Sequence, residues 1–106
     1  MSREDVIGLI KKYLHQLEKN GIPVYKAYLY GSYARNDAKE ESDIDVMIIS
    51  DLFDDCDDTV LAKPWSLTLR VDHRIEPYTV GKKRFFTDDI SPILEIVRRE
   101  GIEITL

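Results

Sequence analysis

Residues 31–46 hold the side chains of this sequence that are best suited to chemistry. Gly31 follows a predicted strand, and because it lacks a Cβ another group can approach its backbone closely. Ser32 offers a hydroxyl where a short helix is predicted to begin, and the free N–H groups at a helix start attract anions. Arg35 adds a positive charge one turn later. Together these residues predict a corner that binds phosphate groups.

Two carboxylates come next along the chain. Asp43 and Asp45 flank Ile44 at the start of a second predicted strand, and ten residues separate Asp43 from Ser32. Side chains two residues apart lie on one face of a strand, with Cα atoms about 6.5–7 Å apart, so both carboxylates can converge on a hard divalent cation such as Mg²⁺. A phosphate corner facing a two-carboxylate metal site is suited to phosphoryl or nucleotidyl transfer.

Each half of this pattern alone has an ordinary explanation. A Gly-Ser pair after a strand is usually a turn, and an Asp-x-Asp sequence is usually a solvated strand end or a helix cap. The two halves at this spacing, in a strand–turn–strand context, are much more specific than either half.

Helices and strands alternate around this segment. The predicted helices cover residues 3–20, 59–69 and 88–100, with one or two helical turns at 33–38, and the predicted strands cover 24–30, 44–49, 74–80 and 102–106. Pro64 must begin, kink or end its helix, and Pro77 predicts an edge strand or a bulge. The order predicts one α+β domain (an α/β sandwich) over residues 1–106, with a mixed sheet of about four strands packed by helices.

The composition of the chain argues against several classes of protein. Hydrophobic residues make up 43% of its 106 residues, which argues against disorder. A net charge of −5 provides no basic excess, so no direct nucleic-acid binding is expected. A single cysteine, Cys56, excludes an internal disulfide and fits a reducing cytosol. No apolar stretch approaches the roughly 20 residues of a membrane span, so we expect a cytoplasmic protein with no membrane partner.

The charge is unevenly distributed along the chain. Residues 36–58 hold ten acids and one base, and five of the acids are the aspartates of Asp51–Asp58. These five predict a solvated acidic loop. Lys82, Lys83 and Arg84 predict a solvated basic turn, while Trp65 is either a core residue or an exposed anchor for a partner.

The motif resembles that of a known family. Gly31-Ser32 followed after ten residues by Asp43-x-Asp45 resembles the signature of the nucleotidyltransferase superfamily related to DNA polymerase beta. The flanking residues 33–35 and 42–46 resemble its minimal nucleotidyltransferase (MNT) branch, whose members are small proteins often encoded beside a HEPN-domain partner. Asn36 stands where relatives commonly carry Gly, and Asn is the non-glycine residue that best tolerates a positive φ.

The family has a third carboxylate on a later strand, for which this chain offers two candidates. Glu76 lies inside the predicted strand and Asp72 precedes it by four residues, or about 13 Å along a strand. The segment Arg74-Ile75-Glu76-Pro77 resembles the corresponding segment of these small transferases, so we prefer Glu76 and keep Asp72 as the alternative. The alternative to a metal-binding role is that Glu76 is a surface carboxylate that forms an ion pair with Arg74.

The resemblance implies a role for each site residue. Asp43 and Asp45 would hold two Mg²⁺ ions that grip the triphosphate of ATP, and Glu76 would hold the ion nearer the attacking hydroxyl. Gly31 and Ser32 would seat the β- and γ-phosphates, and Arg35 would offset phosphate charge. The resemblance thus implies that Asp43, Asp45 and Glu76 are the catalytic and metal-binding residues, and that Gly31, Ser32 and Arg35 bind the nucleotide.

The resemblance also implies a partner. The expected reaction transfers AMP from ATP to a hydroxyl, that of a tyrosine, on a cognate HEPN ribonuclease toxin, and the chain would act as the antitoxin. Two alternatives stay open: a non-catalytic antitoxin that neutralises the toxin by binding, and a nucleotidyltransferase acting on a small hydroxylated molecule. Association with a second copy of the chain or with the toxin also stays open.

Overall fold

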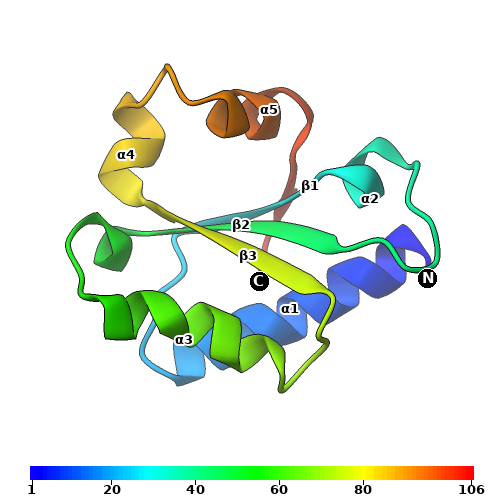
Figure 1. Cartoon of the computed structure of the whole chain (residues 1–106), viewed down its shortest axis with the longest axis horizontal. Helices are drawn as coiled ribbons and strands as arrows, with labels where there is room; N and C mark the ends of the chain where they lie inside the picture. Colours follow the sequence, from blue (N-terminus) through cyan, green and yellow to red (C-terminus); the bar gives the residue numbers. More distant parts are fainter.

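A four-stranded mixed sheet forms the middle layer of the protein (Figure 1). In the computed structural model, which describes residues 1–106, the strands lie in the order β3-β2-β1-β4. The central strand β1 (Lys26–Tyr30) pairs antiparallel with β2 (Ile44–Ser50) and with β4 (Ile102–Ile104), and β2 pairs parallel with β3 (Ile75–Gly81). The predicted α+β architecture with a mixed sheet is therefore confirmed, and β3, which contains Pro77, is an edge strand as predicted.

Helices cover both faces of the sheet. In Figure 1, α1 (Arg3–Lys19) and α3 (Asp58–Thr68) lie beneath it, and α4 (Lys82–Thr87) and α5 (Pro92–Glu100) lie above it. The single turn α2 (Ser32–Arg35) follows β1, and a 3₁₀ turn spans Asp51–Asp54 after β2. The predicted helix 88–100 is shorter at its start, because Pro92 occupies the first helical turn, where a missing N–H costs nothing. None of these helices has the length and apolar character that crossing a membrane requires.

The strand β2 separates two cores. Ile44, Val46 and Ile48 are fully buried against α1 and α3, while Met47 and Ile49 are fully buried on the opposite face under α4 and α5. Two-sided burial explains why the central part of β2 is a continuous apolar run rather than an alternating one. Asp45 shares the second face with Met47 and Ile49, at the end of the strand where apolar cover stops.

A hydrogen bond joins the two lower helices. The buried Tyr13 hydroxyl in α1 donates to the Pro64 carbonyl in α3 over 2.6 Å. The helix continues through Pro64, which is buried against α1, and the next residue, Trp65, is 53% exposed. Of the two possibilities raised for Trp65, the exposed position is the one found.

The acidic segment 51–58 is partly structural. The Asp57 carboxylate caps α3 by accepting the Val60 backbone N–H over 3.1 Å. Asp54 caps α4 from a distance along the chain, since its carboxylate accepts the Lys83 backbone N–H over 3.0 Å. The prediction of a solvated loop was therefore incomplete for these two aspartates, and the basic cluster that begins at Lys82 forms the first turn of α4.

Asp72 organises the turn that leads into β3. Its carboxylate accepts the Arg74 backbone N–H over 2.9 Å and the Arg74 guanidinium through Nε at 3.0 Å and Nη2 at 2.8 Å. The hydrogen bonds from Arg74 lower the pKa of Asp72 to about 2. Charge-assisted bidentate pairs of this kind are among the stronger polar interactions in proteins.

Removing either helix cap should destabilise the fold. We expect Asp54→Ala and Asp57→Ala each to lower the free energy of unfolding by about 1 kcal/mol, because each leaves helix N–H groups without an acceptor. Asp55→Ala is the matched control, since the Asp55 side chain is exposed and lies between the two caps. Urea unfolding followed by circular dichroism measures all three, and equal values for Asp54→Ala and Asp55→Ala would contradict the capping role.

Asp72 should make stability depend on pH at the acid end. Because its pKa falls from about 3.8 in the unfolded chain to about 2 in the folded one, its contribution is complete above pH 4 and is lost as the pH falls toward 2. We expect Asp72→Asn to lower the free energy of unfolding by about 1 kcal/mol at pH 7 and by progressively less below pH 4. Thermal unfolding from pH 7 to 2.5 tests this, with the exposed Asp89→Asn as control.

Candidate active site

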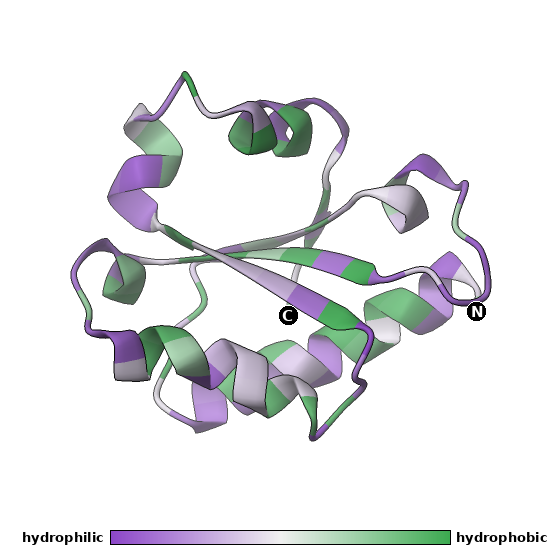
Figure 2. Cartoon of the chain, in the orientation of Figure 1, coloured by the Kyte–Doolittle hydropathy of each residue, from purple (hydrophilic) through white to green (hydrophobic).

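Strand register places three polar side chains in one row across the sheet. Tyr30 of β1 pairs with Asp45 of β2, and Asp45 pairs with Glu76 of β3. Directly paired residues on neighbouring strands point to the same face, so the three side chains share the face that α4 and α5 cover farther along. Figure 2 shows hydrophilic segments interrupting β2 and β3 at the end of the sheet near α2.

Three carboxylates meet at this end of the sheet. Asp43 precedes β2 and is exposed, Asp45 is half-buried, and Glu76 is exposed on the edge strand. Burial, and then the neighbouring Asp43 charge, raise the pKa of Asp45. Desolvation, and then the charges of Asp43 and Asp45, raise the pKa of Glu76. The three groups therefore repel one another when all are ionised.

This donor set suits a hard cation. No three His, Cys, Asp or Glu side chains are gathered as closely as a complete protein cage for a metal requires. Mg²⁺, however, is usually held by one or two carboxylates together with substrate phosphates and water. Asp43 and Asp45 on one strand face, with Glu76 beside them, supply oxygen ligands whose mutual repulsion a cation would relieve. The residues fit a metal that binds together with a phosphate substrate.

Gly31 brings a bare stretch of backbone against Asp45. Its φ of 78° lies in the region that favours glycine, and a Cβ at this position would overlap the Asp45 carboxylate. Ser32 begins α2 directly afterwards, and Asn36 ends it in the left-handed conformation with φ 64°. The substitution of Asn for Gly at position 36 is therefore compatible with the turn, as expected from the tolerance of Asn for this conformation.

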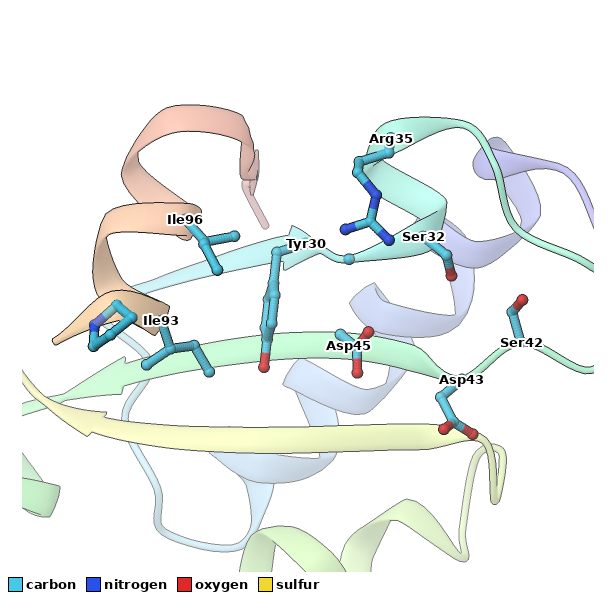
Figure 3. A pocket seen from close by; sticks show the side chains of 10 residues that line it. Tyr30, Ser32, Arg35, Ser42, Asp43, Asp45, Ile93 and Ile96 are labelled. Atoms are coloured by element: carbon cyan, nitrogen blue, oxygen red, sulfur yellow. The ribbon is translucent and has the colours of Figure 1, made fainter.

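A pocket of about 560 Å³ opens beside these residues (Figure 3). Its polar wall comes from the end of β1, α2 and the start of β2, and consists of Tyr30, Gly31, Ser32, Arg35, Ser42, Asp43 and Asp45. Its apolar wall comes from α5 and consists of Pro92, Ile93 and Ile96. The volume lies within the usual range for a small-molecule site. Five of the six predicted site residues line this pocket, and Glu76 lies outside its lining, on the neighbouring strand.

Arg35 reaches toward the pocket from α2 (Figure 3). Its Nε lies 3.3 Å from the Asp37 carboxylate, and its Nη1 lies 3.5 Å from the Glu100 carboxylate at the end of α5. Its charge also partly offsets the rise in the pKa of Asp45. The guanidinium thus lies beside the pocket, where its exposed position leaves it accessible to an anion.

Two groups of pocket residues were not predicted from the sequence, namely Tyr30 and the apolar residues of α5. Burial, and then the Asp45 charge, raise the pKa of Tyr30 to about 12, so its phenol stays protonated in the pocket. Tyr30 immediately precedes the Gly-Ser pair, which was the available signal. Ile93 and Ile96 belong to a predicted amphipathic helix, but nothing in its periodicity distinguishes pocket wall from core.

The two candidates for the third carboxylate have different surroundings. Asp72 is held by three hydrogen bonds from Arg74, whereas Glu76 is the register partner of Asp45. Arg74 therefore pairs with Asp72, and the alternative explanation of Glu76 as an ion-pair partner of Arg74 does not hold.

Structural comparison finds the same fold in solved proteins. A Sulfolobus solfataricus protein assigned to the nucleotidyltransferases aligns with a TM-score of 0.67 at 12% identity, covering 95% of this chain and 80% of that one. A toxin–antitoxin crystal structure with AMP-PNP aligns at 0.62 and 22% identity, covering 93% and 72%. A mutant of the toxin–antitoxin MntA-HpeT aligns at 0.61 and 18% identity, covering 90% and 71%. At these identities the likeness shows the fold alone.

Sequence comparison identifies the family. No curated protein matches the chain at a significant level. The chain matches the model of one protein family, which is described as a nucleotidyltransferase domain. The match extends over residues 7–104, from α1 to β4. It includes the pocket and all three carboxylates. The chain therefore belongs to the nucleotidyltransferase domain family.

Proposed function

We propose that this chain is a metal-dependent nucleotidyltransferase that moves AMP from ATP to a tyrosine hydroxyl of a HEPN ribonuclease toxin, and so acts as its antitoxin. One observation supports nucleotidyl transfer in particular. The Gly31 backbone, the Ser32 hydroxyl and the Asp43 and Asp45 carboxylates all line the same wall of one pocket. Membership of the nucleotidyltransferase domain family supports the same chemistry.

The pocket suggests how a nucleotide would be held. The Ser32 hydroxyl, the backbone beside Gly31 and the Arg35 guanidinium lie together, so they would bind the β- and γ-phosphates. The apolar wall of Ile93 and Ile96 would pack against the base. Asp43, Asp45 and Glu76 would hold two Mg²⁺ ions, which when bound neutralise triphosphate charge and lower the pKa of the acceptor hydroxyl.

The transfer itself is a displacement at phosphorus. The acceptor oxygen attacks the α-phosphorus, while the bond from that phosphorus to the oxygen bridging to the β-phosphate breaks and pyrophosphate leaves with the electron pair. The acceptor proton passes to Glu76, which we propose as the third carboxylate because it lies beside Asp45 and is exposed at the sheet edge. Asp72 is not available for this role because Arg74 occupies its carboxylate.

The choice of partner rests on two observations of a different kind. Two solved neighbours are toxin–antitoxin structures, one of them with AMP-PNP, an ATP analogue. Glu76 is also exposed on a strand whose outer edge pairs with no other strand, so a separate molecule could bring the acceptor to it. We favour a protein acceptor over a small hydroxylated molecule because two of the solved neighbours are toxin–antitoxin structures.

Neutralising the two site aspartates should abolish transfer without unfolding the protein. We expect Asp43→Asn and Asp45→Asn each to reduce AMP transfer to the proposed HEPN acceptor by at least about 100-fold, because each removes a cation ligand. Stability should not fall, since each change removes a repulsive charge. Intact mass after incubation with ATP and Mg²⁺ measures the transfer, and Asp89→Asn is the control.

The same variants separate the proposed function from its alternatives. Loss of toxin neutralisation together with loss of transfer supports catalysis. Neutralisation that survives in Asp43→Asn would identify a binding antitoxin. An unmodified HEPN protein together with labelling of a small hydroxylated molecule would contradict the protein acceptor.

Gly31 should tolerate no side chain. We expect Gly31→Ala to lower the free energy of unfolding by about 1–2 kcal/mol and to weaken ATP binding, because the new Cβ meets the Asp45 carboxylate at a positive φ. Gly8→Ala in α1 is the matched control: nothing lies within 4 Å of its added Cβ, and it should stabilise the helix by about 0.5–1 kcal/mol. Equal effects at the two glycines would contradict the close contact.

A further inference from the structure

An apolar stripe lies on the outer face of α3. Leu61, Trp65 and Leu69 are spaced four residues apart, and they are 37%, 53% and 78% exposed. Residues at this spacing lie above one another on a helix, and the backbone of Leu69, which ends α3, is still helical. The buried contacts of α3 are made by other residues, namely Pro64, Leu67 and Thr68. The stripe therefore contributes nothing to the core.

This arrangement differs from the other exposed apolar side chains. Phe86 is 59% exposed but packs edge-on against Tyr25, with ring centroids 5.9 Å apart. Ile90 and Leu106 are single exposed residues in a loop and at the end of the chain. Only α3 presents three exposed apolar side chains in a row. Such a row at helical spacing is typical of a surface that docks another protein.

The stripe leads toward the candidate active site. In Figure 1, α3 lies directly below β3, and a short turn connects Leu69 to the start of β3. Glu76 is the second residue of β3 and is exposed. The outer edge of β3 pairs with no strand, and Glu76 projects from the sheet face opposite to α3, so the Leu69 end of the stripe and the third carboxylate lie on either side of the same free strand edge.

The other end of the stripe is acidic. Asp51, Asp55 and Asp58 are exposed and make no hydrogen bond or ion pair, in contrast to the two capping aspartates of the same segment. Asp58 is the first residue of α3, three positions before Leu61, and Asp51 and Asp55 lie in the segment just before it, so a partner seated on the stripe would meet negative charge at this end. The surface of a partner that complements this face of α3 would be apolar along its centre and basic at one end.

We infer that the outer face of α3 docks the protein that accepts the nucleotide, and that this acceptor presents an apolar surface with basic residues beside Asp51, Asp55 and Asp58. The inference rests on the proposed function. A partner docked along the stripe would reach Glu76 by extending around the unpaired edge of β3, while ATP occupies the pocket between α2 and α5. A second copy of this chain is a poorer occupant, because its net charge of −5 opposes self-association.

The test measures the acceptor and the nucleotide separately. Initial rates of AMP transfer to the proposed HEPN acceptor are recorded at varied acceptor and at varied ATP concentration. We expect Trp65→Ala and Leu69→Ala to raise the KM for the acceptor about tenfold or more, with the KM for ATP unchanged, because central aromatic and apolar anchors dominate interfaces. Asp58→Lys should raise the acceptor KM by an amount that shrinks at high salt. Phe86→Ala is the matched control, an exposed aromatic residue on another helix.

Trp65 also provides a direct signal, because it is the only tryptophan of the chain. Incorporated 5-fluorotryptophan gives one ¹⁹F resonance, which should shift or broaden when the acceptor is added without ATP. An unchanged resonance during tight binding would overturn the docking surface.

The remaining outcomes are distinguishable. No transfer by the unaltered chain would refute the proposed function and this surface with it. Normal transfer with acceptor KM values equal to that of Phe86→Ala would refute the surface alone. A parallel rise in the KM for ATP would show a structural effect and refute it as well. Conversion of a dimer to a monomer by Trp65→Ala, with the acceptor KM unchanged, would assign the stripe to a second copy.

Discussion

The packing of the Asp45 carboxylate against the bare backbone of Gly31 is the contact on which the rest of the site depends. A side chain at position 31 would occupy the space of that carboxylate, and the positive φ there suits glycine. The contact lets the end of β1 and the start of β2 approach, so the first residues of α2 and a carboxylate share one corner of the pocket. Tyr30 and Glu76 join the site through register, since they are the cross-strand neighbours of Asp45. The close approach of β1 and β2 and the parallel pairing of β2 with β3 together assemble groups that are 46 positions apart in the sequence, from Tyr30 to Glu76.

The strand β2 carries both the core and the chemistry, and the two requirements act against each other at its first residues. Ile44 and Val46 are fully buried on the face toward α1, so the backbone between them cannot move freely. Asp45 projects from the other face beside two further carboxylates, and burial, followed by the charge of Asp43, raises its pKa. The unfavourable electrostatics of the site are thus held in place by apolar burial on the opposite side of the same strand. Local destabilisation of this kind, compensated elsewhere, is common at functional sites.

Local pattern predicted the parts of this protein that depend on neighbours in sequence. The helix at 3–20, the buried strand at 44–49 and the edge position of the strand containing Pro77 all follow from periodicity and from the missing N–H of proline. The cap of α4 could not be predicted in this way, because Asp54 lies 29 residues from the Lys83 N–H that it accepts. The apolar pocket wall of α5 was equally hidden, since an amphipathic helix shows one apolar face whether that face meets core or ligand. The choice between Asp72 and Glu76 needed the register of β3 and the path of the Arg74 side chain, neither of which is a local property.

The outer edge of β3, next to the exposed Glu76, is an unpaired sheet edge. An edge strand exposes unpaired N–H and C=O groups, and proteins usually protect it with charge, proline or a covering element. Here β3 has a proline at position 77 and a charge at Glu76, and its outer edge pairs with no other strand. Protection by side chains discourages a second strand from pairing there and still leaves the carboxylate accessible to a hydroxyl. The exposed Glu76 and the unpaired edge of β3 therefore leave this end of the site accessible from outside, as the proposed transfer to a second molecule requires.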